Sequence, residues 1–128
     1  MTEKEMLRRT KEFAIRIVKL VNALPNTIPG RAIGSQLIRS GTSVTANYRA
    51  ACRGRSKAEF IAKLGTVEEE SHESSFWMEL IMESGMKTQK LVQSLHDEAE
   101  ALTKIVVASI RTMRARVRNP KSAIQNPK

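Results

Sequence analysis

The sequence is poor in cysteine, aromatic residues and proline, and each shortage excludes a class of protein. One cysteine in 128 residues excludes an internal disulfide framework and a cysteine-based zinc site. Aromatic residues make up only 4% of the chain, so aliphatic side chains must supply most of a core. No stretch approaches the roughly 18 consecutive apolar residues of a membrane span. The length suits one domain, and we expect no membrane association.

Acidic residues are also few compared with basic ones. The chain carries 22 lysines and arginines against 13 acids, which gives a formal net charge of +9. The 41% of hydrophobic residues recur in a regular pattern, so wholesale disorder is not expected. The segment Met1–Arg9 is charged and lacks the apolar run of a signal peptide. We therefore expect a basic cytoplasmic protein.

Apolar residues recur at three- and four-residue steps in four segments. This period predicts helices at about residues 4–24, 30–53, 57–84 and 89–117, and no segment alternates as a strand would. Ser56 and Glu59 fit a capping box that would start the third helix. Short connections favour an all-α, antiparallel up-down-up-down four-helix bundle over residues 1–118. Residues 119–128 are expected to form a flexible C-terminal tail.

The helical segments carry features of a protein that associates with itself. The first, third and fourth have more apolar residues than a single core-facing stripe requires. A second apolar stripe on a small bundle usually meets a partner surface. The second segment is rich in glycine, serine and alanine, which allow helices to approach closely. Since most soluble oligomers are symmetric, the pattern favours a homo-oligomer.

Charge is segregated along the chain. No acid occurs from Phe13 to Ala58, and seven glutamates then follow between Glu59 and Glu83. Glu70 and Glu73 are three residues apart, a spacing at which like charges repel on a helix. Arginines of the second segment would relieve this repulsion by gripping the carboxylates with their guanidinium forks. The alternative is that these arginines remain unpaired and contact phosphate.

The end of the chain is basic and contains no acid from Arg111 onward. Cations that complement a helix C-terminus account for one turn, not for this longer run. A phosphate-binding patch is the alternative, although without interleaved aromatic residues base stacking is not indicated. The candidate nucleic-acid contacts are Arg111, Arg114, Arg116, Arg118 and Lys121, followed by Arg53 and Arg55.

Motifs of catalysis are missing from the sequence. It has no Walker loop, no Gly-x-Gly-x-x-Gly and no nucleophile elbow. Glu69 and His72 match half of a di-iron motif, but Gln93 precedes His96 where the second half needs a glutamate. Cys52 has the setting of a small core or surface residue, and the charge of its neighbour Arg53 would lower its thiol pKa. We expect no enzyme, no metal site and no cofactor.

The central block of the sequence resembles a known family. It reads Arg31-Ala-Ile-Gly-Ser-Gln-Leu-Ile-Arg-Ser-Gly-Thr-Ser-Val, then Ala46-Asn47-Tyr48, Arg55-Ser-Lys-Ala-Glu-Phe60 and Phe76-Trp77. Over roughly residues 13–111 the chain resembles the four-helix-bundle proteins encoded by 23S rRNA intervening sequences. That family is similar in fold to the accessory variability proteins of diversity-generating retroelements. Members of this wider group form ring-like homopentamers, and the accessory proteins bind nucleic acid and a reverse transcriptase through basic surface.

The resemblance implies a ring-like homo-oligomer, a pentamer, and it marks a set of residues for a buried polar network. These are Arg31, Gln36, Arg39, Ser43, Asn47, Tyr48, Glu70, Glu73 and Trp77. The leading hypothesis is a non-enzymatic pentameric bundle whose basic surface binds RNA or DNA. The alternative is a protein-interaction scaffold for an enzyme or regulator encoded nearby, without a nucleic-acid role.

Overall fold

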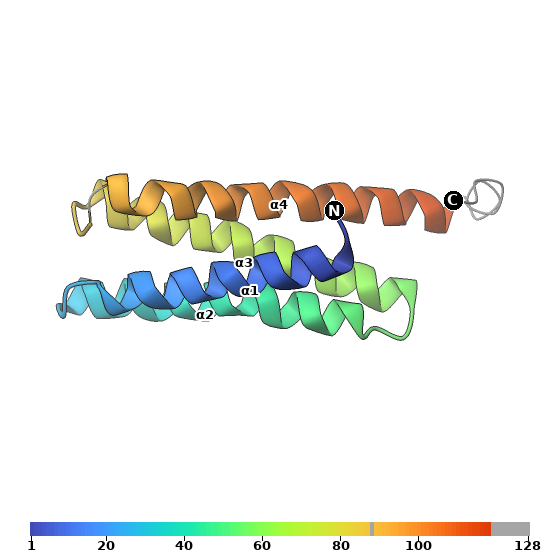
Figure 1. Ribbon diagram of the computed structural model, residues 1–128, viewed down its shortest axis with the longest axis horizontal. Coiled ribbons are helices and arrows are strands. Elements are labelled where there is room, and N and C mark those ends of the chain that lie inside the picture. Colours follow the sequence, from blue (N-terminus) through green and yellow to red (C-terminus); the bar gives the residue numbers. More distant parts are fainter. Residues whose placement is uncertain (88, 119–128) are drawn as a thin grey trace.

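The computed structural model describes residues 1–87 and 89–118, which form four α-helices (Figure 1). Helix α1 spans Glu3–Asn22, α2 spans Ile28–Cys52, α3 spans Lys57–Glu83 and α4 spans Gln89–Arg118. These ranges contain no strand, which confirms the all-α class for the described chain. The predicted tail, residues 119–128, lies outside the described residues.

Threonine side chains start the first two helices. Thr2 accepts a hydrogen bond from the Glu5 backbone N–H while the Glu5 carboxylate accepts one from the Thr2 N–H, which makes a capping box. Thr27 caps α2 by accepting from the Gly30 N–H. Pro29 lies in the first turn of α2, where its missing N–H leaves no hydrogen bond unmade. The helix therefore begins two residues before the predicted start at residue 30.

Serine starts α3, but the predicted capping box is only half formed. Ser56 accepts from the Glu59 backbone N–H at 3.1 Å. The Glu59 carboxylate accepts instead from the backbone N–H of Arg55, one residue earlier than a capping box requires. At the other end of α3, Gly85 has a φ of 77°, a left-handed conformation in which glycine avoids the strain of a side chain.

The helices pack in the order in which they follow one another in the chain. Helix α2 lies against both α1 and α3, α3 lies against α4, and a smaller contact joins α1 to α4 (Figure 1). The four helices run lengthwise beside one another, and the C-terminal end of α4 and the α2–α3 connection lie at the same end of the molecule. This placement brings two basic segments of the sequence to one end.

The core between the helices is aliphatic, with small polar groups at the helix contacts. Ile17, Leu37 and Leu64 are among its buried members. The buried hydroxyl groups of Ser40 on α2 and Ser74 on α3 lie 2.9 Å apart. Within residues 1–87 and 89–118, no buried side-chain nitrogen or oxygen lacks a hydrogen-bond partner. The polar groups in the α2–α3 contact are thus satisfied by one another and by helix carbonyls.

None of the four helices combines the length and the apolar character that crossing a bilayer demands, as judged over the described residues.

Candidate nucleic-acid interface

The last two turns of α4 carry four exposed arginines, Arg111, Arg114, Arg116 and Arg118. Within the described part of the chain, none of them makes an ion pair. Three of them, Arg111, Arg114 and Arg118, line a shallow hollow whose single acidic lining residue is Glu68 of α3. Lys121, the fifth predicted contact, lies outside the described residues.

The second predicted group of cations lies at the same end. Arg53 and Arg55 are exposed in the connection between α2 and α3, and Lys57 is exposed at the start of α3. Lys57 lines a groove together with arginines of the last turns of α4, so the two basic segments are neighbours in space. We call this surface the basic end; its members are Arg53, Arg55, Lys57, Arg111, Arg114, Arg116 and Arg118.

The chemistry of the basic end suits phosphate more than bases. Guanidinium groups bind phosphate oxygens bidentately, and clustered cations attract a polyanion over about 8 Å at physiological ionic strength. The carboxylate of Glu59, a nearby acid, is hydrogen-bonded to the Arg55 backbone. No aromatic side chain lines either hollow, so the surface offers no stacking platform within the described residues.

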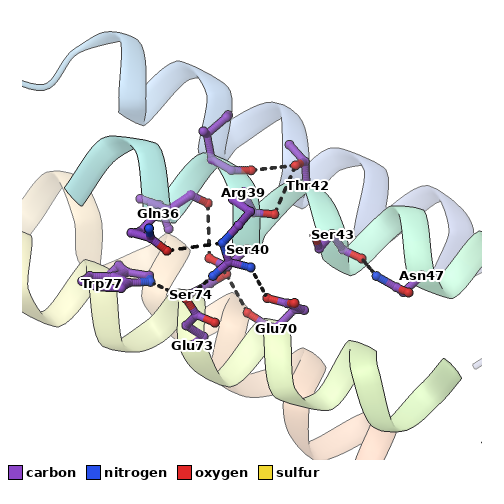
Figure 2. A network of polar contacts seen from close by, with 12 residues as sticks. Gln36, Arg39, Ser40, Thr42, Ser43, Asn47, Glu70, Glu73, Ser74 and Trp77 are labelled. Atoms are coloured by element: carbon purple, nitrogen blue, oxygen red, sulfur yellow. Dashed lines mark hydrogen bonds and ion pairs between the residues drawn. The ribbon is translucent and has the colours of Figure 1, made fainter. Parts of the chain in front are cut away.

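A second polar cluster joins α2 to α3 (Figure 2). Arg39 of α2 reaches across to α3, where Nη1 lies 3.1 Å from Glu70 Oε1 and Nη2 pairs with Glu73 Oε2. Its Nε donates to Gln36 Oε1 at 3.3 Å. The indole Nε1 of Trp77 donates to the same Glu73 oxygen at 2.9 Å. These contacts bring together five of the nine residues that the family resemblance marks.

The Arg39 cluster supplies the cation that the sequence analysis expected α2 to place against Glu70 and Glu73. One guanidinium bridges Glu70 and Glu73, so their mutual repulsion on α3 is offset by a shared cation. The cluster differs from the buried network expected from the sequence, because the Arg39 side chain is 46% exposed. Solvent screening at that exposure limits an ion pair to about 0.2–1 kcal/mol of stability. Arg39 is therefore a paired arginine, not one free for phosphate.

The other four marked residues lie apart from the Arg39 cluster. Arg31 donates to the side-chain oxygen of Asn26 at 2.9 Å, near the start of α2. Asn47 donates to the Ser43 carbonyl at 2.9 Å, farther along α2 (Figure 2). Tyr48 is buried in the core, where burial raises its phenol pKa well above the ordinary value. The network expected from the resemblance is thus divided into separate local contacts.

Cys52, at the end of α2, has a raised thiol pKa. The shift comes first from burial and then from the nearby carboxylate of Glu3, which outweigh an opposing hydrogen bond with Tyr48. The expectation that Arg53 would lower this pKa is wrong, since burial and the Glu3 charge dominate the thiol's surroundings. A raised pKa favours the protonated thiol over the thiolate, which is the nucleophilic form.

Two inter-helix contacts have no counterpart in the sequence analysis. Arg9 of α1 grips Glu98 of α4 with both Nε and Nη2, at 2.6 and 2.8 Å. His96 of α4 lies with Nε2 2.9 Å from Glu79 Oε2 of α3 and with Nδ1 3.6 Å from Asp97 Oδ1. Burial alone would lower the pKa of His96, but the hydrogen bond to Glu79 and the nearby Asp97 carboxylate outweigh it, and the pKa is raised. Both pairs join residues far apart in sequence, so local spacing gave no signal of them.

Comparison with known proteins identifies the family. The model of the 23S rRNA-intervening sequence protein family matches residues 2–108. The chain belongs to this family. The sequence resemblance is confirmed, although no curated protein matches this member of the intervening-sequence family. The family match ends before Arg111, so the arginines of the α4 end lie beyond it while Arg53 and Arg55 lie within it.

A solved structure from the same group supports the assignment. It is the crystal structure of a protein of unknown function from the S23 ribosomal protein family of Bacteroides thetaiotaomicron VPI-5482. The two chains are 30% identical and superpose with a TM-score of 0.78, over 87% of this family member and 99% of the Bacteroides protein. The helical fold is therefore shared over nearly the whole solved chain.

Proposed function

We propose that this protein is a non-enzymatic nucleic-acid-binding protein that holds the phosphate backbone with its basic end. The observation that carries the proposal is a groove that Lys57 shares with arginines of the α4 end, at the end of the molecule where the α2–α3 connection also lies. The arginines of the α4 end and of the connection are exposed, and within residues 1–87 and 89–118 they form no ion pair. Contacts to phosphate carry little sequence information, so binding depends on charge and shape.

We further propose that the chain is an antiparallel up-down-up-down bundle that assembles into a ring-like homopentamer. The packing order α1–α2–α3–α4 supports the bundle. Exposed apolar side chains support a subunit interface; among them are Val18 on α1 and Phe76, which is 48% exposed beside Trp77 on α3. A ring repeats the basic end and raises the affinity for a long polyanion by multivalency. Light scattering on the protein as it elutes from a size-exclusion column should give a molar mass five times the 14.3 kDa of one chain.

The binding proposal is tested by charge reversal in a salt series with a labelled RNA duplex. One variant changes Arg111, Arg114 and Arg118 to Glu. A matched control changes Lys19, Lys87 and Lys90 to Glu, which alters the net charge equally. Lys19 is near the end of α1 and lines one hollow with Lys87, and Lys90 is the second residue of α4, so all three lie at the opposite end of α4 from the arginines. If each arginine neutralises one phosphate, the negative slope of the log binding constant against log salt becomes shallower by up to about 2.7 in the first variant.

The control decides between a local contact and a general charge effect. We expect the arginine variant to lose at least tenfold in affinity at 100 mM salt and the control to lose far less. Equal losses in the two variants would show that only net charge matters. Equal affinity of the arginine variant and the wild type would remove the basic end as the binding surface.

One observation favours a second candidate function, a protein-interaction scaffold. The groove at the basic end is lined by four apolar residues, Ala58, Ile61, Ala62 and Val117, as well as by Lys57 and three arginines. An amphipathic helix with acidic flanks would bury its apolar face there. Such a helix, carried by an enzyme or regulator encoded nearby, would be recovered in stoichiometric amount by a pull-down that resists nuclease treatment.

A further inference from the structure

A cluster of metal-ligating side chains lies between α3 and α4, away from the basic end. It consists of Glu79 from α3 with His96 and Glu100 from α4. His96 and Glu100 are four residues apart, so both side chains lie on the same face of α4. One ligand atom from each of the three residues lies within 4.8 Å of the other two. The cluster therefore converges on one point from two helices.

We propose that Glu79, His96 and Glu100 bind a divalent transition-metal ion, with Zn²⁺ as the expected occupant. One imidazole nitrogen and two carboxylate oxygens are ligands that zinc accepts in proteins, at distances of about 2.0–2.2 Å. Harder ions such as Mg²⁺ prefer oxygen ligands alone, and the imidazole argues against them. Three protein ligands leave the fourth tetrahedral position to water.

The distances require only small side-chain movements. Ligands of one tetrahedral zinc ion lie about 3.4 Å apart, given the metal–ligand lengths. The 2.9 Å separation of His96 Nε2 and Glu79 Oε2 must open by about half an ångström. Glu100 is exposed, and over the described residues it makes no ion pair or side-chain hydrogen bond that would hold it elsewhere. Its carboxylate is free to close the remaining gap.

The second nitrogen of His96 has the kind of neighbour that a metal-bound histidine uses. Nδ1 lies 3.6 Å from Asp97 Oδ1 and 3.5 Å from Gln93 Nε2, while Nε2 lies 2.9 Å from Glu79 Oε2. Carboxylates beside the non-ligating nitrogen fix the ring orientation and raise the basicity of the ligating nitrogen. The imidazole is itself mostly buried, with an 11% exposed side chain, so its orientation is also held by packing. Asp97 Oδ1 accepts a hydrogen bond from Gln93 Nε2 at 2.8 Å, so its position has a local cause. A simple His96–Glu79 ion pair would not explain the position of Glu100.

The test is titration of the chelator-treated full chain with CoCl₂, followed by visible absorption, and with ZnCl₂, followed by calorimetry. We expect one ion per chain. Glu100→Gln and His96→Ala should each weaken binding at least tenfold, and Glu100→Gln should leave the fold intact because Glu100 is exposed. His72→Ala is the matched control, since His72 is an exposed histidine of α3 outside the cluster.

Three outcomes would overturn the proposal. They are the absence of saturable binding to the wild type, equal affinity of the wild type and Glu100→Gln, or an equal loss in His72→Ala. If His96→Ala unfolds, which circular dichroism would reveal, Glu100→Gln alone decides the result. None of these measurements depends on nucleic-acid binding, so the metal site fails or holds independently of the proposed function.

Discussion

Two glycines inside helices should respond in opposite ways to the same substitution. Gly41 of α2 faces α1, and a Cβ added to it would lie 2.8 Å from both Cγ1 and Cγ2 of Ile17. Ile17 is fully buried in the core, so it has no space into which to move. Gly65 of α3 has no such neighbour, because an added Cβ meets nothing within 4 Å. The pair separates helix propensity from packing.

The expected magnitudes follow from these two settings. Alanine in place of glycine within a helix gains about 0.5–1 kcal/mol from reduced backbone entropy. Gly65→Ala should therefore be more stable than the wild type by that amount. Gly41→Ala makes the same gain, but overpacking against Ile17 costs about 1–3 kcal/mol. We expect Gly41→Ala to be less stable than Gly65→Ala by about 1–3 kcal/mol.

The assay is urea unfolding followed by circular dichroism at 222 nm, at one protein concentration because assembly changes apparent stability. A double-mutant cycle with Ile17→Ala identifies the clashing partner. Once the γ carbons are gone, only the Cβ of residue 17 stays close, at 3.1 Å, so Gly41→Ala should cost much less stability than it does beside Ile17. A coupling of about 1–3 kcal/mol is expected for residues in such contact. Equal stability of Gly41→Ala and Gly65→Ala, or a coupling near zero, would refute the close α1–α2 approach.

Two further predictions concern charge and titration. Arg39→Gln leaves Glu70 and Glu73 without their shared cation and should lower the free energy of unfolding by about 1 kcal/mol, with a larger loss in low salt than in 1 M salt. Urea unfolding at both salt concentrations measures this loss, and a loss independent of salt would contradict the prediction. Burial raises the pKa of Cys52, so its contribution to stability is complete below the unfolded-thiol pKa of about 8.5 and is lost as pH rises through the higher folded value. The rate of iodoacetamide alkylation of the native chain should accordingly reach half its maximum above pH 8.5, whereas a midpoint at or below 8.5 would contradict a raised pKa.

The helices could be predicted from the sequence because their apolar period is strong, but their ends depend on single residues. Leu24 continues the apolar period of the first helix, and the predicted helix therefore ran to residue 24. The structure ends α1 at Asn22 and packs Leu24 against the core from outside the helix. Pro25 accounts for the difference, because a proline disfavours helical geometry in the residue before it. The apolar period indicates which residues are buried, and Leu24 is partly buried although it lies outside the helix.

The Arg39 cluster could be predicted in kind but not in detail. The spacing of Glu70 and Glu73 indicates that cations face them, yet several arginines of α2 were candidates. The choice depends on how α2 and α3 are aligned, and the Ser40–Ser74 contact sets Arg39 opposite Glu73. Arg31, eight residues before Arg39, lies about 12 Å away along α2, which puts it out of reach of Glu70 and Glu73. The alignment of α2 with α3 arises from packing, so the spacing of residues within one helix does not predict it.

The proposed metal site and the basic end lie too far apart along α4 for direct electrostatic interaction. Arg114 lies 18 residues beyond His96 on α4, which places it about 27 Å farther along the helix. That distance exceeds three screening lengths of about 8 Å at physiological ionic strength. The charge of a metal ion at His96 is therefore not felt at the basic end through solvent. If zinc nevertheless changes RNA affinity, the coupling must pass through helix packing or subunit assembly, because direct electrostatics cannot span the gap.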